Sequence, residues 1–418
     1  MKSVKVAIIG AGNRGNVYGD FSLQQLNQIE VIAIAEPDQQ RRELFAAKHH
    51  LRADSCFESW EQMMLERPEA DAVIVTTQDQ KHYEPTMAAL DLGYHVLVEK
   101  PLSPSLQECI EMERKAKEKN RLLVLCYVLR YTAFFQMLKQ LLSNQSIGDV
   151  RHISIEMDVA YWHQAHSFVR GNWRNGSESS PMILAKSCHD FDIIDYLLEK
   201  ECIRLSSFGN LSHFTKGNAP VGSTKRCIDG CAVEESCSFS ALKIYTGDNT
   251  GWPVNTISTD LTKQGRLQAI KEGPYGRCVY YCDNDVVDHQ IVNMEYSTGT
   301  TATLTMSGFT NQLKRTVRVL GTKGEINGTM EKNKLVVSRF GQEEQVINLS
   351  PVNVGQHAGG DYGLLSAFVE KVCSFNARDN SSEKIINSHI LAFAAEEARL
   401  TNETINLKRY ENKISSLV

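Results

Sequence analysis

The sequence predicts a two-domain α/β protein, in which a parallel sheet with crossover helices precedes an α+β domain built on an open sheet. The chain has 418 residues, more than the roughly 250–300 at which a single hydrophobic core stops growing. Short apolar runs alternate with helical patterns up to about residue 125, as in βαβ units. Farther along, strand-like runs follow one another with glycine turns between them, which indicates a meander.

Residues 1–125 contain apolar runs that we expect to be parallel strands. They are rich in Val, Ile and Leu and do not alternate strictly, as expected when both faces of a sheet are covered. Between them, Pro85–Leu92 and Ser105–Lys119 have helical periodicity, and Ser103-Pro104 before the second supplies a cap and a first-turn proline. The expected strands are Val4–Ile9, Val31–Ala35, Ala72–Thr76, His95–Val98 and Leu122–Tyr127.

Residues 126–418 have a different pattern, which we assign to the second domain. Val150–Val159 alternates as a strand, and Val279–Phe309 and Thr316–Asn348 are expected to form successive strands. Residues 216–263 are the least regular part and contain three cysteines, so we expect an insertion or a long functional loop there. Helices are expected at Phe134–Leu142, His189–Leu198, Leu364–Cys373 and Ser388–Leu400.

The composition is that of an ordinary globular chain. Lys and Arg number 45 against 50 Asp and Glu, for a formal net charge of -5, so there is no electrostatic reason to expect a nucleic-acid or acidic-membrane partner. The apolar stretch Leu122–Leu129 is far shorter than the roughly 20 residues that span a bilayer. No secretory signal is expected either, because the N-terminal apolar run is too short. We therefore expect a cytoplasmic protein whose 11 cysteines are reduced or bind metal.

A glycine-rich motif follows the first expected strand directly. In Gly10-Ala11-Gly12-Asn13-Arg14-Gly15, Gly10 would tighten the turn, Gly12 would let a pyrophosphate approach the backbone, and Gly15 would allow close packing of helix on strand. Glu36 ends the second strand, where its carboxylate would accept hydrogen bonds from an adenosine ribose and repel a 2′-phosphate. The motif, with Asn13 and Arg14 among its cofactor-binding residues, predicts NAD as the cofactor. NADP is the less favoured alternative, left open by Arg41 and Arg42.

The next chemical signal is Glu99-Lys100-Pro101, which comes directly after the expected strand His95–Val98. Ligands of open α/β sheets bind beyond the carboxyl ends of the strands, so Lys100 would lie at the crevice. A partly desolvated lysine there would hold or relay a substrate hydroxyl proton. The alternative is a surface lysine in a turn.

Taken in order, these motifs resemble the glucose–fructose oxidoreductase/inositol dehydrogenase (Gfo/Idh/MocA) family. The resemblance covers essentially the whole chain. It implies an N-terminal Rossmann domain and a C-terminal domain with a large, mostly antiparallel open sheet that often mediates oligomers, so we expect a homo-oligomer, a dimer or tetramer. It also implies oxidation or reduction of a carbinol of a small sugar or cyclitol by a pyridine nucleotide. The segments that carry it, besides the glycine motif and Glu99–Pro101, are Arg130-Tyr131, Gly148-Asp149-Val150, His357–Asp361 and Ser388–Arg399.

The resemblance also assigns residues to the site. Lys100 matches the family's catalytic lysine, His189 its histidine, and Asp192 its later carboxylate. Where the family has an aspartate four residues before the histidine, this chain has Ala185, with Lys186 beside it. We expect Lys186 and Asp192 to bind substrate, in an arrangement that differs from a simple inositol dehydrogenase.

A second departure lies after the strand Ala72–Thr76. The family commonly has Thr-Pro-Asn before a histidine, and here the residues are Thr77-Gln78-Asp79. Thr77 and His82 still match the family and are expected near the nicotinamide end, and Glu99 and Lys100 are expected to complete the cofactor contacts.

The expected chemistry explains these residue types. When a hydride leaves a carbinol carbon, the hydroxyl proton must leave too, or the developing alkoxide must be stabilised. Histidine suits the proton transfer because its pKa lies near neutrality. His189 is expected to open a helix, whose positive dipole end would lower that pKa, while Lys100 would stabilise the oxyanion.

The segment from Tyr161 to Arg174 is dense in aromatic and polar side chains. Aromatic faces stack on sugar C–H surfaces, and Arg, His and Asn hydrogen-bond hydroxyl or acidic groups. His163, Arg170 and Trp173 are therefore candidate substrate contacts. The alternative is an interdomain packing loop.

The cysteines of the irregular region leave a metal site open. Cys227, Cys231 and Cys237 lie within eleven positions, and the pair Cys278 and Cys282 would supply a fourth thiol. A thiolate-bound structural zinc would anchor such a loop. The spacing is not that of CxxC pairs, and free cysteines are common buried residues.

The combined prediction is a NAD-dependent oxidoreductase that transfers a hydride between nicotinamide and a carbinol carbon of a sugar, sugar derivative or cyclitol. One alternative is an NAD-dependent glycosidase that oxidises its sugar transiently and eliminates the aglycone. Ala185 and the aromatic segment favour it, whereas the chain lacks the Thr-His-Gly pattern expected of such enzymes. The other alternative is a non-catalytic sugar- or NAD-sensing regulator, against which the presence of Lys100 and His189 argues.

Overall fold

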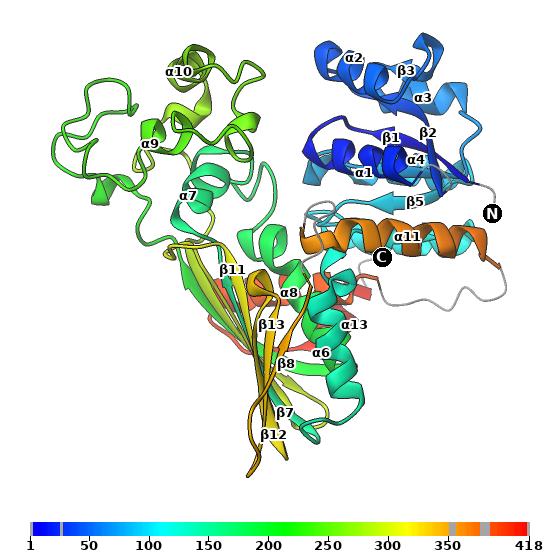
Figure 1. The fold of residues 1–418 in the computed structure, drawn as a ribbon, viewed down its shortest axis with the longest axis vertical. Coiled ribbons are helices and arrows are strands. Elements are labelled where there is room, and N and C mark those ends of the chain that lie inside the picture. Colours follow the sequence, from blue (N-terminus) through cyan, green and yellow to red (C-terminus); the bar gives the residue numbers. More distant parts are fainter. Residues whose placement is uncertain (1–2, 26–27, 351–356, 377–384, 416–418) are drawn as a thin grey trace.

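The computed structural model describes residues 3–25, 28–350, 357–376 and 385–415. These residues form two domains, each built on one sheet (Figure 1). The blue-to-cyan N-terminal part holds the first sheet, and the larger second sheet extends away from it. The predicted fold class is confirmed: a Rossmann-like parallel domain precedes a domain with a large, mostly antiparallel sheet.

The N-terminal sheet is parallel throughout, with the strand order β3-β2-β1-β4-β5-β6. The order reverses between β1 and β4, and open α/β sheets bind ligands at such a point, beyond the carboxyl ends of their strands. The strands are β1 (Val4–Ile9), β2 (Ile29–Ala35), β3 (Cys56–Phe57), β4 (Ala72–Val75), β5 (His95–Val98) and β6 (Leu123–Leu125). Sequence patterning missed β3, because two residues carry no periodic signal.

Helices separate these strands, as crossover connections require. Helix α5 begins after Ser105, whose side chain caps it by accepting a hydrogen bond from the backbone N–H of Glu108. The helices are α1 (Asn13–Gln24), α2 (Gln39–Lys48), α3 (Trp60–Glu66), α4 (Tyr83–Asp91) and α5 (Leu106–Glu118).

The second sheet has the order β14-β13-β12-β11-β7-β10-β9-β8-β15. Every neighbouring pair is antiparallel except β7 and β10, which run parallel. The strands are β7 (Val150–Asp158), β8 (Cys202–Asn210), β9 (His289–Tyr296), β10 (Thr301–Ser307), β11 (Lys314–Gly321), β12 (Gly324–Thr329), β13 (Lys334–Arg339), β14 (Gln345–Asn348) and β15 (Ile405–Asn406).

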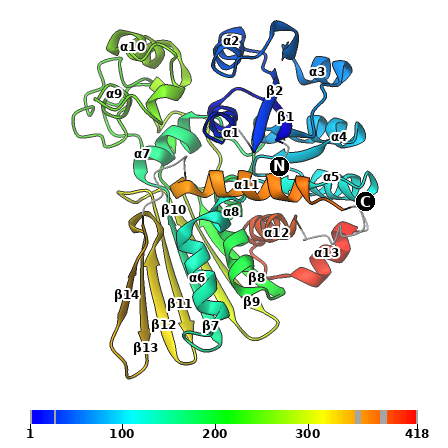
Figure 2. The same ribbon diagram turned by 45° about the vertical axis from the view of Figure 1, so that its right-hand side comes forward.

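Helices cover one face of this sheet (Figure 2). Helix α8 packs on β7 and β10, and α12 packs on both α8 and β8. Strands β9 and β10 alternate buried and more exposed residues, a pattern typical of a sheet with one covered face. The helices of this part are α6 (Ala133–Ser143), α7 (Tyr161–His163) with the π-helix Gln164–Arg170, α8 (Met182–Leu198), α12 (Asn387–Thr401) and α13 (Leu407–Ser415).

Helix α8 begins at Met182, and the prediction that a helix opens at His189 was wrong. Most residues of α8 are buried, on all sides of the helix. A helix buried all round lacks the apolar stripe by which an amphipathic helix is recognised, so its first two turns gave no periodic signal. His189 therefore lies in the interior of the helix, beyond the first turn to which the dipole effect is confined.

Helix α11 (Gly360–Cys373) returns from the second sheet to the N-terminal domain. It packs along α1 and β1, and Figure 2 shows it lying across the boundary between the two domains. The rings of Phe21 and Tyr362 meet edge to face, with their centroids 5.1 Å apart. The helix thus fixes the dinucleotide-binding half against the rest of the chain.

The predicted insertion lies between β8 and β9, where residues 211–288 contain α9 (Ala241–Tyr245) and α10 (Lys263–Glu272). It packs around two small apolar cores: one around Phe214 and Val279, which it shares with Ala165 and Val169, and one of its own around Tyr245 and Ile270. None of the described helices combines the length and the apolar character that crossing a bilayer requires.

Candidate active site

The glycine motif forms the turn that its spacing predicts. Gly10 has a φ of +99°, in the left-handed region that favours glycine. A Cβ on Gly15 would stand 1.9 Å from the carbonyl oxygen of Gly10, whereas a Cβ on Gly12 would meet nothing within 4 Å. The turn is therefore packed tightly on one side and open on the other, where the amide groups at the start of α1 face an anion site.

Thr76 holds this turn from the neighbouring strand, a role that sequence reasoning missed. Its hydroxyl lies 2.9 Å from the carbonyl oxygen of Ile9 and 2.8 Å from that of Gly10. A threonine after an apolar strand is a common pattern, and its contact with the glycine turn depends on the pairing of β1 with β4.

Glu36 lies where its sequence position predicts, beside the glycine turn. Its carboxylate accepts hydrogen bonds from the backbone N–H groups of Ala11, at 2.7 Å, and Asp38, at 3.0 Å. The guanidinium of Arg42 donates to the carbonyl oxygen of Glu36, at 2.5 Å. An acidic and a basic side chain thus both border the region where a ribose would bind.

Arg14 and Glu99 belong to an ion network between the domains. Arg14 donates to Glu99, at 2.6 Å, and to Asp361 at the start of α11, at 2.5 Å. Tyr18 donates to the same oxygen of Glu99, at 2.6 Å, and His357 lies 3.2 Å from Asp361. The side chains of Arg14 and Glu99 are therefore engaged in these contacts. Asn13, the first residue of α1, is exposed.

Lys100 reaches from the end of β5 to helix α8. Its ammonium group donates to the carbonyl oxygen of Ala185, at 2.8 Å, one helical turn before His189. The peptide bond to Pro101 is cis. The lysine and the histidine that the resemblance assigns to catalysis are therefore brought to the same part of α8, although they come from different domains.

His82 packs against the turn that contains Lys100 and Pro101, and it is 1% exposed. Its ring lies 2.8 Å from the carbonyl oxygen of Pro101 and 3.1 Å from that of Thr77. Thr77 in turn donates to the carbonyl oxygen of Lys81. These contacts join the loop after β4 to the loop after β5, directly beyond Lys100 in the chain.

His189 and His163 are buried imidazoles with unused hydrogen-bonding capacity. The Nδ1 atom of each is buried without a hydrogen-bond partner among the described residues. Burial lowers the pKa of His189 well below its usual 6.5, and the positive charge of Lys100 adds to this. Burial likewise lowers the pKa of His163, with Lys186 as the next cause. Both rings are therefore neutral at neutral pH, and desolvation takes the place of the helix dipole expected for His189.

Positive charge gathers around the two histidines. Burial lowers the pKa of Lys186 well below its usual value, and the neighbouring charges of Arg315 and Lys100 lower it further. Arg315 forms a buried ion pair with Asp190, at 2.8 Å, whereas Lys186 has no ion pair or hydrogen bond among the described residues. The site therefore holds a desolvated lysine without a direct ion pair among the described residues, and the charges of Asp190 and Glu331 only partly offset the lowering of its pKa.

Asp192 is held by another residue. Both of its carboxylate oxygens accept hydrogen bonds from Arg130, at 2.8 and 2.7 Å. Asp192 and Arg130 also line a cavity of about 890 Å³ at the domain boundary, which Lys100, His163 and His189 do not line. The carboxylate of Asp192 is thus paired with Arg130, and its expected role in substrate binding stays a prediction.

The aromatic segment supplies one wall of the site. The indole N–H of Trp173 lies 3.1 and 3.2 Å from the two carboxylate oxygens of Asp79, which ties the segment to the loop after β4. Trp252, from the insertion, packs edge to face on His163 with ring centroids 4.8 Å apart. Sequence reasoning missed Trp252, because nothing in the irregular insertion indicated that it folds back onto the site.

Arg170 is buried against the insertion. It is 1% exposed, and it donates to the carbonyl oxygens of Arg277, at 2.6 Å, and Phe239, at 2.7 Å. Its guanidinium is thus held by backbone of the insertion, and the expected contact with substrate stays a prediction.

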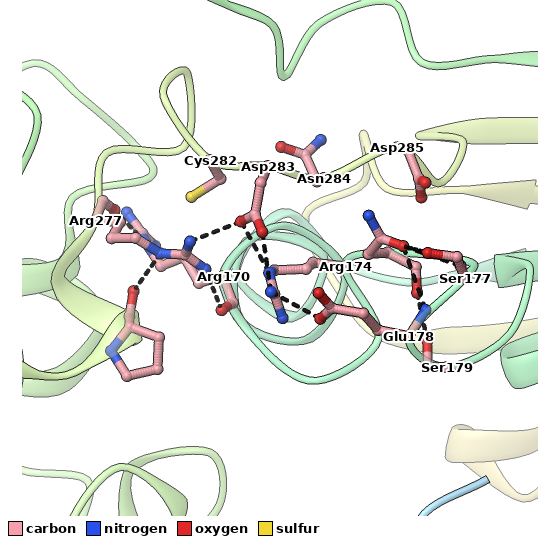
Figure 3. A network of polar contacts seen from close by, with 12 residues as sticks. Arg170, Arg174, Ser177, Glu178, Ser179, Arg277, Cys282, Asp283, Asn284 and Asp285 are labelled. Atoms are coloured by element: carbon pink, nitrogen blue, oxygen red, sulfur yellow. Dashed lines mark hydrogen bonds and ion pairs between the residues drawn. The ribbon is translucent and has the colours of Figure 1, made fainter. Parts of the chain in front are cut away.

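A charged network anchors this part of the insertion to the aromatic segment (Figure 3). Asp283 lies between two guanidinium groups and accepts hydrogen bonds from Arg174, at 2.8 Å, and Arg277, at 2.7 Å. These hydrogen bonds lower the pKa of Asp283, so the carboxylate stays charged over the working pH range. Arg277 also donates to the carbonyl oxygen of Arg170, at 2.9 Å.

This arrangement is that of the two-domain oxidoreductases that bind a nicotinamide dinucleotide on the first domain and build the substrate site with the second. Two family models match the chain: the oxidoreductase family, NAD-binding Rossmann fold, over residues 4–127, and the C-terminal alpha/beta domain of the same family over residues 139–374. The chain therefore belongs to the Gfo/Idh/MocA oxidoreductase family.

Relatives of known name act on sugars and cyclitols. The scyllo-inositol 2-dehydrogenase (NADP(+)) IolW of Bacillus subtilis is 29% identical over 41% of this chain and 45% of its own length. The glucose-6-phosphate 3-dehydrogenase of the same organism is 24% identical over 56% of this chain and 70% of its own. The structure of an inositol dehydrogenase homolog complexed with NAD+ from Azotobacter vinelandii has the same fold, with a TM-score of 0.68 and 16% identity over 97% of each chain.

Proposed function

We propose that the protein is a NAD-dependent dehydrogenase that transfers a hydride between nicotinamide and a carbinol carbon of a sugar, sugar derivative or cyclitol. The observation that carries the proposal is the meeting of Lys100 and His189 on one part of α8. Lys100 comes from the dinucleotide-binding domain and is fixed to the carbonyl oxygen of Ala185. His189 is neutral and keeps a free ring nitrogen. An ammonium donor and an imidazole acceptor side by side suit a carbinol oxygen.

The residues around the glycine turn fit a dinucleotide. A backbone turn that is open at Gly12 and leads into a helix N-terminus would hold the pyrophosphate. Glu36 would accept hydrogen bonds from the adenosine ribose, and its charge disfavours a 2′-phosphate, which supports NAD over NADP. When bound, the nicotinamide ring accepts or supplies the hydride.

Replacing Glu36 by glutamine is expected to weaken NAD binding about 10-fold and to narrow its preference over NADP. The reason is that a hydrogen bond to a charged group contributes about 1.5–3 kcal/mol, more than one to a neutral group, and that the carboxylate no longer repels a 2′-phosphate. Titration calorimetry with each dinucleotide measures both effects without a substrate. Glu30→Gln, on the exposed side of β2, is the control. Unchanged affinity for both dinucleotides would contradict the role of Glu36.

In the proposed mechanism this chain moves one proton. The neutral imidazole of His189 accepts the proton of the substrate hydroxyl as hydride leaves the carbinol carbon. The ammonium group of Lys100 donates a hydrogen bond to the same oxygen and stabilises the negative charge that develops on it. In the reverse direction the imidazolium of His189 returns the proton to the oxygen.

The pH dependence of kcat/KM tests this assignment. Because the pKa of His189 is lowered, the protonation that removes the base occurs only at lower pH than in an exposed histidine. We expect kcat/KM for substrate oxidation to stay level as the pH falls to about 6.5 and to decline below it. An acid limb centred above this value, and retained in His189→Ala, would show that another group is the base.

The charges around the histidines narrow the class of substrate. Lys186 is desolvated and has no direct ion pair among the described residues, and Arg315 forms its ion pair with Asp190. Ala185 stands where the family pattern has a carboxylate, so the site has lost a negative charge. A carboxylate or phosphate on the substrate would pair with Lys186 and recover the energy of its desolvation. The proposal therefore extends to an anionic sugar, such as a sugar acid or a sugar phosphate.

A panel of compounds tests both parts of the proposal. Neutral sugars, inositols, sugar acids and sugar phosphates are each incubated with protein and NAD, and NADH is followed by its absorbance. We expect NADH with one or more of the anionic sugars. Release of aglycone from aryl glycosides without net NADH would contradict the dehydrogenase proposal and support a glycosidase. Binding of a sugar without either product would support a non-catalytic regulator.

Changing Lys186 to methionine is expected to raise KM for the anionic substrate 10-fold or more, because a charge-assisted pair contributes about 1.5–3 kcal/mol. The effect on kcat is expected to be smaller, since the anionic substituent does not react. Steady-state kinetics separate the two parameters. Lys271→Met, on the exposed surface of α10, is the matched control, and an equal loss in that variant or no loss in Lys186→Met would contradict the anion contact.

A further inference from the structure

Four cysteine side chains of the insertion converge on one small cavity. Cys227, Cys231, Cys237 and Cys278 all line it, although the last comes from a distant part of the insertion. Two backbone hydrogen bonds bring the segments together: Cys227 N–H donates to the carbonyl oxygen of Gly276, at 3.0 Å, and Cys278 N–H donates to that of Lys225, at 2.9 Å. Backbone hydrogen bonds therefore hold the segments of Cys227 and Cys278 together, whatever the rotamers of the two side chains.

The sulfur of Cys227 is surrounded by donors. It accepts a hydrogen bond from the backbone N–H of Ala241, at 3.4 Å, and lies 3.7 Å from a guanidinium nitrogen of Arg170. Hydrogen bonds of this kind stabilise a sulfur that carries negative charge, and they surround the cysteine ligands of metal centres.

The buried guanidinium of Arg170 also favours a negative charge beside this cavity. It is almost fully buried, its other hydrogen bonds go to two carbonyl oxygens, and its Nη1 atom has no hydrogen-bond partner. No described carboxylate forms an ion pair with it, although Arg174 and Arg277 nearby share Asp283. A buried cation is costly unless an anion is close, and thiolates at the neighbouring cavity would supply that charge.

The size of the cavity selects between a single ion and a cluster. The space between the thiols is about 10 Å³, enough for one water-sized sphere. Sulfur atoms around a single zinc ion lie only about 2.3 Å from it and leave no such space. In agreement, the described residues include no group of three or more His, Cys, Asp or Glu side chains arranged to hold a single metal ion. We therefore infer that any metal centre at these thiols is larger than one ion.

We propose that Cys227, Cys231, Cys237 and Cys278 bind a [4Fe–4S] cluster. Four cysteine thiolates are the ligand set of such clusters. The four thiolates would hold the irons of the cluster at this cavity. Each thiol releases its proton to solvent on binding, and Arg170 offsets the negative charge that the site acquires. No change in the oxidation state of the iron is needed for this role.

The cluster would anchor the insertion and, through it, one wall of the active site. Cys227 packs with Tyr245, Val254 and Ile270 in a core that contains few residues, and small cores are commonly completed by metal centres or disulfides. Trp252, which packs on His163, lies two residues before Val254. The thiol site thus stabilises the segment that carries this tryptophan.

The test is the metal content of the full-length protein, purified without oxygen in the presence of a thiol reductant. We expect about four iron atoms and four acid-labile sulfides per chain, and the broad visible absorption of thiolate-bound iron–sulfur clusters. Stoichiometric zinc without iron would overturn the cluster, as would the absence of both metals after attempted oxygen-free reconstitution with ferric iron, sulfide and the thiol reductant.

Variants locate the cluster. Cys278→Ser and Cys231→Ser are each expected to lower the iron content to a quarter or less of that in the wild-type protein. Cys373→Ser, at an exposed position on α11, is the matched control and should retain all of it. If one substituted protein fails to fold, the other carries the comparison, and full iron content in a folded variant would contradict the assignment. These readouts need no substrate, so they stand apart from the proposed dehydrogenase activity.

Discussion

Replacing Lys100 by methionine is expected to lower kcat/KM for the oxidation of the sugar substrate by a factor of about 10²–10⁴, the range typical of a lost acid–base or oxyanion contact. Methionine keeps much of the aliphatic volume and removes the ammonium group that donates to the carbonyl oxygen of Ala185. The alkoxide then develops without its hydrogen-bond donor, while His189 remains in place. Most of the loss should therefore appear in kcat.

Two measurements distinguish a chemical role of Lys100 from a structural one. NAD affinity, measured by calorimetry, should fall much less than kcat, because the glycine turn and Glu36 supply most of the expected dinucleotide contacts and Lys100 only one. The variant Lys271→Met, on the exposed surface of α10, should keep its full turnover. Full turnover in Lys100→Met, or a proportional loss of NAD affinity and kcat, would contradict a role of Lys100 in the chemical step.

Local sequence signals predicted the dinucleotide-binding half well. Every requirement of the glycine turn acts over a few residues, and the φ of Gly10 and the tight contact at Gly15 bear this out. The strands of a parallel sheet are continuous apolar runs, so their positions were also predictable. Only β3 escaped, because it consists of Cys56 and Phe57 alone.

The rest of the site depends on contacts between distant segments, which a pattern in one segment does not reveal. His189 was placed at a helix start because α8 is buried all round and shows no apolar stripe. The expectation for Arg170 rested on residue type, whereas its partners, Arg277 and Phe239, lie more than sixty positions away. Asp192 likewise pairs with Arg130, across a separation of 62 residues.

The same long-range contacts determine the charge of the active site. The two carboxylates on α8 near His189 pair with arginines: Asp190 with Arg315 and Asp192 with Arg130. One oxygen of Asp190 has no hydrogen-bond partner among the described residues, and the charge of this carboxylate partly offsets the lowering of the pKa of Lys186. The specificity for an anionic substrate that we propose is thus a consequence of how the neighbouring acidic side chains are paired.

The pair of Asp190 and Arg315 gives the largest expected effect on stability. The two side chains are 1% and 7% exposed, with nitrogen and oxygen 2.8 Å apart. Removing one partner leaves an unpaired charge in the interior, so Asp190→Ala is expected to lower the free energy of unfolding by about 3–5 kcal/mol. The loss would be measured by urea denaturation at neutral pH, where Arg315 remains charged.

Two comparisons test whether the loss of stability comes from the buried charge. Glu325→Ala breaks the exposed pair with Arg318 and is expected to cost less than about 1 kcal/mol, because water screens surface ion pairs. The double replacement of Asp190 by leucine and Arg315 by methionine removes both charges and should recover most of the stability lost in Asp190→Ala. If the double variant is no more stable than Asp190→Ala, the loss comes from packing around α8 and not from the buried charge of Arg315.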